Sequence, residues 1–144
     1  MRIKQRDVHL LGAYLEALEA YRACSKHAWA LSDPDDIRAS NEQAIADEPN
    51  FKGSDCRVAV VRCPDGNAIG GYVVLKGYLM GLFADKGLSG TALLQMAVQD
   101  GARKLDCFDG FLPDWYKQRG WVETSREANW DPNGPDVVFM QYLG

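Results

Sequence analysis

Residues 111–121 read Phe111-Leu112-Pro113-Asp114-Trp115-Tyr116-Lys117-Gln118-Arg119-Gly120-Trp121, and this stretch predicts a short helix that leads into a strand. Pro113 suits the first turn of a helix, because an N–H group there would have no partner within the helix. Gly120 suits the end of the helix, because glycine adopts the left-handed backbone conformation at little cost. We therefore expect a helix over Pro113–Arg119 and a strand over Trp121–Thr124.

Three strands are expected upstream of this helix. β-Branched and apolar residues dominate Arg57–Cys63, Ala68–Leu75 and Tyr78–Phe83, and turn residues separate these runs at 63–67 and 76–77. Runs of this kind, joined by short turns, are typical of hairpins. The sequence therefore predicts three consecutive antiparallel strands.

Helices and short strands alternate in the rest of the chain. A glycine-containing turn at 85–91 precedes an apolar helix over 92–103, and short strands are expected at 105–108 and 136–142. Two helices, one over Asp7–Cys24 and one from Asp33 to just before Pro49, precede all the strands. Because the strand–helix–strand order around the turn requires a crossover, one pair of strands is expected to be parallel.

The composition is that of an ordinary globular domain. The chain has 144 residues, of which 47% are hydrophobic and 25% charged, enough for one domain with a hydrophobic core. The formal net charge of −4 disfavours a nucleic-acid partner. The sequence shows no apolar run of membrane-spanning length and no signal-peptide pattern, so we expect a cytoplasmic protein with no membrane partner.

The cysteines do not indicate a metal site. Cys24, Cys56, Cys63 and Cys107 show no CxxC spacing and no neighbouring histidine pair. Zinc sites usually show such spacing, so no metal is expected. We expect these cysteines to be reduced and buried.

The segment from Trp115 to Trp121 resembles a motif of one enzyme superfamily. Its pattern, aromatic-Tyr-x-x-x-Gly-aromatic, is similar to the corner between the last helix and the next strand in the Gcn5-related N-acetyltransferase (GNAT) superfamily. The order of elements expected between Arg57 and Tyr142 is also similar to that of the superfamily. Residues 105–113 and 135–140 resemble compact GNAT-like proteins of bacteria and their phages.

This resemblance implies both a fold and an activity. The fold would be α+β, with a single acetyltransferase-like domain over residues 1–144. Its mixed, mostly antiparallel sheet would have a central parallel strand pair and helices on both faces. The activity would be direct transfer of an acetyl group from acetyl-coenzyme A to a primary amine of a small molecule, a protein lysine or a protein N-terminus. The alternative is a catalytically weak or inactive module of the same fold that binds a protein partner.

The resemblance also implies where acetyl-coenzyme A would bind. The turn before the helix at 92–103 corresponds to the turn that holds the coenzyme's pyrophosphate through backbone amides at a helix N-terminus. The residues assigned to this role are Leu88, Ser89, Gly90, Thr91 and Ala92. Asp85 stands where the superfamily usually has glutamine or arginine, and Leu88 where it has its first glycine. In a second register Gly87 takes the glutamine or arginine position, with Gly90 and Ala92 as the small pair.

Two further groups are implied for the reaction itself. Tyr116 corresponds to the tyrosine that protonates the leaving thiolate. It could equally be a core aromatic residue beside Trp115. The backbone N–H of Leu82 or Phe83, on the strand that separates from its parallel neighbour, corresponds to the group that polarises the thioester carbonyl.

The sequence leaves the general base and the acceptor open. Asp106 and Asp109 flank a strand end and His27 follows the first helix, so each is a candidate base. Cys107 as an acyl-carrying nucleophile has no histidine paired with it in the sequence. The acidic and aromatic loop over 129–136 either faces a cationic acceptor or is a solvated loop pinned by Trp130.

Overall fold

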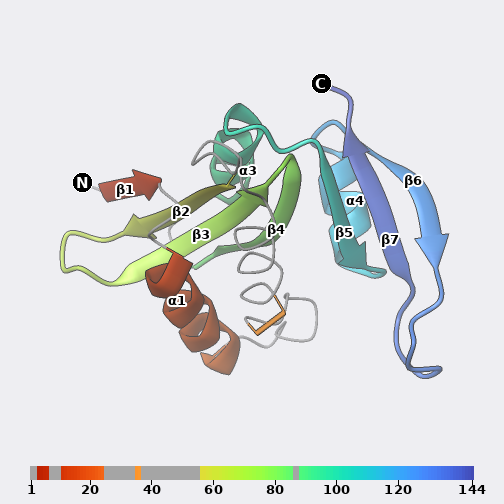
Figure 1. Cartoon of the computed structure of the whole chain (residues 1–144), viewed down its shortest axis with the longest axis horizontal. Coiled ribbons are helices and arrows are strands. Elements are labelled where there is room, and N and C mark those ends of the chain that lie inside the picture. Colours follow the sequence, from red (N-terminus) through yellow and green to blue (C-terminus); the bar gives the residue numbers. More distant parts are fainter. Residues whose placement is uncertain (1–2, 7–10, 25–34, 37–55, 86–87) are drawn as a thin grey trace, which may run out of the picture.

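A single mixed sheet of seven strands forms the centre of the protein (Figure 1). The computed structural model describes residues 3–6, 11–24, 35–36, 56–85 and 88–144. In chain order the strands are β1 (Ile3–Arg6), β2 (Cys56–Arg62), β3 (Ala68–Leu75), β4 (Tyr78–Ala84), β5 (Lys104–Phe108), β6 (Trp121–Glu127) and β7 (Val137–Tyr142). Their spatial order is β1-β2-β3-β4-β5-β7-β6. Only β4 and β5 are parallel among these pairs, so the expected central parallel pair in a mostly antiparallel sheet is confirmed.

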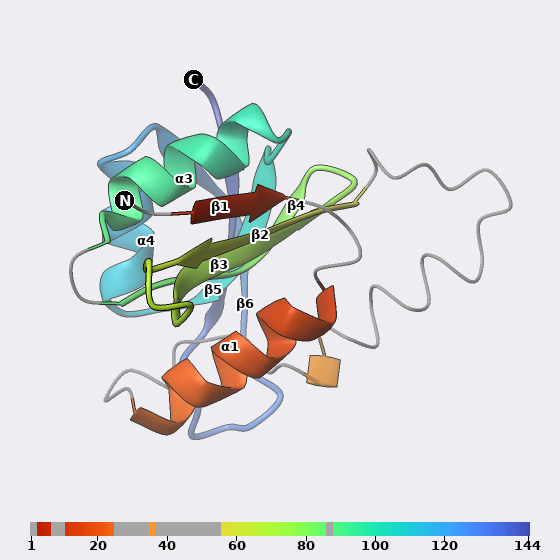
Figure 2. The same cartoon turned by 90° about the vertical axis from the view of Figure 1, so that its left-hand side faces the viewer.

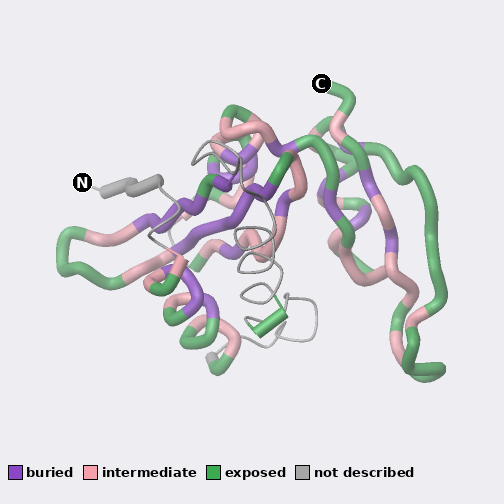
Figure 3. Tube along the Cα trace, in the orientation of Figure 1, coloured by how far each residue is buried: buried purple, intermediate pink, exposed green. Residues whose placement is uncertain are grey.

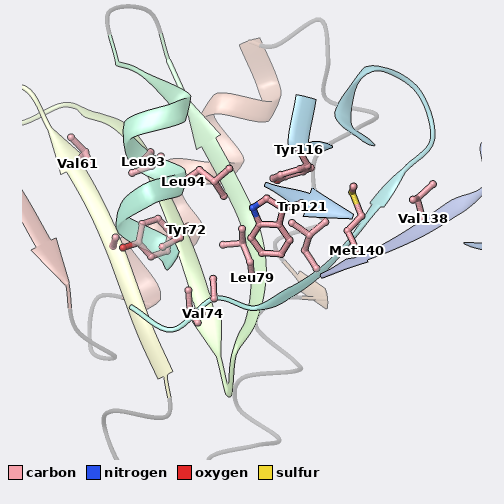
Figure 4. Close-up of a cluster of buried hydrophobic side chains, with 14 residues drawn as sticks. Val61, Tyr72, Val74, Leu79, Leu93, Leu94, Tyr116, Trp121, Val138 and Met140 are labelled. Carbon is pink, nitrogen blue, oxygen red and sulfur yellow. The ribbon is translucent and has the colours of Figure 1, made fainter. Parts of the chain in front are cut away.

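Helices cover both faces of this sheet, as expected (Figure 2). They are α1 (Leu11–Cys24), α3 (Gly90–Gln99) and α4 (Phe111–Lys117). Helix α1 packs on one face over β2, β3 and β4 through the buried Tyr14, Leu15 and Leu18. Figure 3 shows that one side of α1 is buried and the other exposed. Helices α3 and α4 lie on the opposite face, over a second buried cluster drawn in Figure 4. None of the described helices is long and apolar enough to cross a bilayer.

Several element boundaries differ from those expected. Strand β3 has the predicted bounds, whereas β1 was not predicted and α3 begins two residues earlier than the expected start at Ala92. The expected helix over Asp7–Cys24 is described only from Leu11. The helix expected from Asp33 lies outside the described residues, apart from the helical Asp35 and Asp36.

The start of α4 corrects the prediction that Pro113 opens this helix. Helix α4 begins at Phe111 and Pro113 is its buried third residue. Proline is tolerated there because the first-turn N–H groups have no partner in the helix anyway. The helix ends at Lys117, and Gly120, with φ of 93°, lies beyond the cap. The left-handed conformation predicted for Gly120 is therefore confirmed, although it follows the helix rather than ending it.

Strands β4 and β5 diverge soon after they meet. Their register contains one pair, Tyr78 with Lys104. Beyond it β4 continues to pair with β3, while β5 pairs with β7 along its whole length. Figure 1 shows the two strands separating from this point. The edges of β4 and β5 that face each other therefore carry backbone groups outside any described ladder, which positions the candidate site.

Candidate active site

A β-bulge on β4 lies along the opening between β4 and β5. Gly81 and Leu82 both stand opposite Tyr72, where the register with β3 shifts. Gly81 has φ of 57°, a conformation that glycine adopts readily. Its carbonyl accepts a hydrogen bond of 2.6 Å from the hydroxyl of Tyr14 on α1. Helix α1 therefore fixes the bulge, which takes Leu82 out of the regular ladder.

The direction of the peptide groups favours Leu82 over Phe83 as the amide that faces the opening. The Asp85 N–H donates to the Ile69 carbonyl of β3 at 2.7 Å. Peptide groups alternate between the two edges of a strand, so Phe83, two residues earlier and opposite Gly71, also directs its N–H towards β3. Its side chain is buried in the α1 cluster. Of the two predicted residues, Leu82 is therefore the one whose backbone N–H is the candidate for polarising a carbonyl in the opening.

The start of α3 offers fewer backbone donors than the sequence implied. The Leu88 N–H donates to the Asp85 carbonyl and the Ala92 N–H donates to the Ser89 hydroxyl, each at 3.1 Å. The amides of Ser89, Gly90 and Thr91 have no partner in the part of the chain that the structure describes. These three amides, at the positive end of the helix dipole, are the donors left for an anion.

Arg119 brings a positive charge to this helix start, which the sequence did not indicate. Its Nε donates to the Thr91 hydroxyl and its Nη1 to the Trp115 carbonyl, both at 2.8 Å. The guanidinium also stacks 4.0 Å above the Trp115 ring. A cleft of about 440 Å³ lies beside these contacts and is lined by Thr91 and Arg119 among others. Arg119 thus ties α4 to α3 and supplies a cation beside a turn that contains Asp85.

Tyr116 is buried beside the opening, on the α3 and α4 face of the sheet. It is 7% exposed, and its ring packs edge-on against Trp115 and Trp121, with centroids 5.1 and 5.9 Å away. Figure 4 shows Tyr116 near Trp121. No hydrogen bond to its hydroxyl is found among the described residues. Burial, and then the nearby Cys107, raise the pKa of Tyr116 well above its usual range. The phenol is therefore protonated at neutral pH, although the same shift makes it a weaker acid than an exposed tyrosine.

Trp121 places a buried donor next to Tyr116. The residue is 1% exposed, and its indole Nε1 has no hydrogen-bond partner among the residues that the structure describes. An unsatisfied buried donor costs about 1–3 kcal/mol. Apart from the aromatic residue itself, no signal in the sequence indicates this donor.

The candidate bases have different surroundings. Asp109 forms an ion pair with Arg126 at 2.8 Å, and Arg126 also bonds Glu123 at 2.8 Å and lowers the pKa of that carboxyl. The guanidinium of Arg126 already occupies Oδ2 of Asp109, which disfavours Asp109 as the base. The carboxylate of Asp106 instead accepts from the Tyr78 hydroxyl at 2.6 Å. His27 lies outside the described residues.

Cys107 is a poor candidate for a nucleophile. Burial, helped by Asp106 and Asp109, raises its pKa to about 12. At pH 7 about one thiol in 10⁵ is then ionised, and only the thiolate attacks an acyl group. The Cys107 thiol faces Tyr116 and fills space between β5 and α4.

Alkylation of Cys107 by iodoacetamide should be slow at pH 7 and should accelerate about tenfold per pH unit up to pH 11, because the raised pKa limits the thiolate. Mass spectrometry of the peptide that contains Cys107, after timed labelling at several pH values, measures this rate. A rate that levels off near pH 9 would show an ordinary thiol and reopen the covalent route.

The loop between β6 and β7 does not use Trp130 as an anchor. Trp130 is 93% exposed, which contradicts the idea that it pins the loop. Instead Asn129 donates to the Pro135 carbonyl at 2.9 Å and accepts from the Asp131 amide at 2.9 Å. Asx-type turns therefore hold the loop and leave the indole in solvent.

Among the described residues, no group of three or more His, Cys, Asp or Glu side chains is arranged to hold a metal ion.

The structure resembles solved proteins, among them named acetyltransferases, over almost its whole length. An acetyltransferase of the GNAT family from Staphylococcus aureus Mu50 is 14% identical, with a TM-score of 0.63, and the match covers 99% of this chain and 98% of that one. Spermidine N-acetyltransferase from Vibrio cholerae, solved with CoA and spermine, is 16% identical, with a TM-score of 0.59 and coverage of 96% and 93%. YjaB from Escherichia coli is 17% identical, with a TM-score of 0.61 and coverage of 100% and 99%.

No family model and no curated protein matches the sequence. At identities this low, structural likeness establishes the fold. The chain has the GNAT fold, as the motif at Trp115–Trp121 implied.

Proposed function

We propose that this protein transfers an acetyl group from acetyl-coenzyme A to a primary amine. The observation that carries this proposal is the opening between β4 and β5. At one end of it lie the amides at the start of α3 that have no described partner, and the protonated phenol of Tyr116 lies beside it. The fold supports the same activity, because solved proteins that share it include acetyltransferases. The complex of the Vibrio enzyme with CoA and spermine favours a cationic amine as the acceptor.

The start of α3 would hold the diphosphate of the coenzyme. The N–H groups of Ser89, Gly90 and Thr91 and the helix dipole attract an anion. Arg119 adds a full positive charge at Thr91, which offsets the acid at Asp85. Beyond Thr91 the acyl arm would enter between β4 and β5, where the Leu82 amide would polarise the thioester carbonyl.

Tyr116 would protonate the leaving group. The amine nitrogen forms a C–N bond with the acetyl carbon, the C–S bond breaks, and the sulfur takes a proton. A phenol that remains protonated at neutral pH can supply it and then regain one from solvent. Direct transfer is favoured over an acyl-enzyme, because Cys107 is almost entirely un-ionised at that pH.

Acetyl-coenzyme A should raise the free energy of unfolding by about 2.7 kcal/mol at 100 times its Kd, because it binds only the folded state. Urea denaturation with and without the ligand measures this, and calorimetric titration supplies the Kd. Acetylated pantetheine, which lacks the diphosphate, is the control and should stabilise far less.

A second candidate is a GNAT-fold module that binds a protein partner without catalysis. The turn favours it, because Asp85 lies there and two of the five implied amides are already bonded. Absence of any stabilisation by millimolar acetyl-coenzyme A would favour this candidate over the enzyme.

A further inference from the structure

Two buried hydrogen-bond donors lie side by side on the α3 and α4 face of the sheet. Trp121 is 1% exposed, and its indole Nε1 has no hydrogen-bond partner among the described residues. Tyr116 is 7% exposed, and its hydroxyl likewise forms no hydrogen bond within the described ranges. The two ring centroids are 5.9 Å apart, and Figure 4 shows the indole nitrogen on the side of its ring that faces Tyr116. Buried polar groups nearly always have a partner, so this pair points to a ligand.

Packing explains the ring of Trp121 but not its N–H group. The ring packs against Tyr116 and against Tyr142, with the second pair of centroids 5.4 Å apart. A phenylalanine ring could make such contacts without burying a donor. Tyr116 and Trp121 both belong to an apolar cluster that includes Leu79 and Leu94, and apolar surroundings strengthen a hydrogen bond to a charged atom. The N–H group therefore needs an explanation of its own.

Both groups act as donors, so an atom that they share has to be an acceptor. The indole N–H has no acceptor capacity. The phenol keeps its proton at neutral pH, because burial raises the pKa of Tyr116. In the proposed reaction such an acceptor forms beside Tyr116, because cleavage of the C–S bond leaves an electron pair and a negative charge on the sulfur.

The raised pKa of Tyr116 gives a second donor a specific use. A thiol has an ordinary pKa of about 8.5 and a tyrosine one of about 10, and burial raises the pKa of Tyr116 further. Transfer of the phenol proton to a thiolate is therefore uphill, and negative charge persists on the sulfur until the transfer is complete. A hydrogen bond from an N–H group that keeps its own proton lowers the energy of this charge, and it is strongest in the transition state.

We infer that the indole N–H of Trp121 donates a hydrogen bond to the sulfur of the coenzyme as the C–S bond breaks, beside the hydroxyl of Tyr116. This inference rests on the proposed function and adds a second donor for the leaving group. The amine nitrogen forms the C–N bond and loses a proton to solvent, and the C–S electron pair goes to the sulfur. Tyr116 then gives its proton to the sulfur and recovers one from solvent, while Trp121 keeps its own proton throughout.

Indole NMR of the full chain tests this contact without any turnover. The Nε1–H signal of Trp121 is observed in protein labelled with ¹⁵N-tryptophan, and its contacts with the rings of Tyr116 and Tyr142 assign it. The ligands are coenzyme A and desulfo-coenzyme A, which lacks the sulfur. Coenzyme A should move the Trp121 proton downfield, and further as the thiol ionises, because hydrogen bonds to charged acceptors are shorter and stronger.

Two controls accompany the titration. Desulfo-coenzyme A should move the Trp121 proton far less than coenzyme A does, because it offers no acceptor at the position of the sulfur. Trp130 is 93% exposed and serves as the internal control, so its indole signal should stay in place with either ligand.

A variant measures how much the N–H group contributes. Trp121→Phe keeps an aromatic ring but removes the donor, and it should raise the pKa of the bound coenzyme thiol by at least about one unit, a tenfold smaller thiolate fraction. The ultraviolet absorbance of the thiolate, measured against pH, gives this pKa. Tyr142→Phe is the matched control, because it alters the other ring neighbour of Trp121 and neither donor of the pair, so the thiol pKa should stay unchanged.

Three results would overturn the inference: a Trp121 proton that coenzyme A does not move, an equal shift with desulfo-coenzyme A, or an unchanged thiol pKa in folded Trp121→Phe. The NMR comparison uses the original protein, so it is decisive even where that variant does not fold. Calorimetric titration of coenzyme A is run alongside. Absence of binding would overturn the proposed function and this inference together, whereas binding without a shift of the Trp121 proton would overturn this inference alone.

Discussion

Gly90→Leu should abolish acetyl-coenzyme A binding, raising its Kd at least about 100-fold, or about 2.7 kcal/mol. A Cβ added at Gly90 would lie 3.2 Å from Cζ2 of Trp115, so a leucine side chain must push that ring away. The same ring carries the stacked Arg119 guanidinium, whose Nε bonds Thr91. One substitution therefore disturbs both the amides and the cation at the start of α3. Calorimetric titration measures the loss.

Two matched variants separate this effect from damage to the fold. Gly90→Ala adds only the Cβ, so Trp115 has to shift by a few tenths of an ångström and binding should weaken by less than in Gly90→Leu. Gly12→Leu places the same large side chain on α1, where nothing lies within 4 Å of the new Cβ. It should bind the coenzyme normally. Unchanged affinity in folded Gly90→Leu would place the diphosphate elsewhere.

Local sequence patterns predicted most of the fold. The hairpin from β2 to β4 followed from β-branched runs separated by turn residues, and β3 has the expected bounds. Strand β1 was missed because Ile3-Lys4-Gln5-Arg6 is short and mostly polar, and it is a strand only because it pairs with β2 at the sheet edge. The start of α4 was predicted two residues late, at Pro113, because proline is accepted anywhere in the first turn of a helix.

The candidate site was predictable only where a motif is contiguous. Tyr116 and the turn at 88–92 could be found, because each lies within a short pattern. Arg119 and Thr91 are 28 residues apart, as are Tyr78 and Asp106, and each pair meets only because β4 and β5 become neighbours and α3 and α4 share a face. Neither contact has a local sequence signal, since it depends on the register of the whole sheet.

The β4 bulge is a second feature that local sequence patterns could not predict, and it concerns a backbone N–H group. The sequence left Leu82 and Phe83 as equal candidates for the carbonyl-polarising amide. The bulge at Gly81, with its positive φ and its hydrogen bond from Tyr14, shifts the register by one residue and favours Leu82 as the proposed amide. A glycine within a strand indicates a bulge, but it does not identify which neighbouring N–H loses its hydrogen-bond partner in the ladder.

Tyr116→Phe should lower kcat about 100-fold or more while the Kd for acetyl-coenzyme A stays nearly unchanged, because it removes the proton donor and keeps the ring. The ring contacts with Trp115 and Trp121 persist in phenylalanine, and no described hydrogen bond to the hydroxyl is lost, so the free energy of unfolding should change little. Steady-state kinetics with the amine acceptor, together with calorimetric titration of the coenzyme, separates chemistry from binding. Tyr142→Phe is the control, because Tyr142 also packs on Trp121, with ring centroids 5.4 Å apart, and should keep full turnover. Equal turnover in Tyr116→Phe would make Tyr116 a core aromatic residue, and protonation of the sulfur would then fall to solvent.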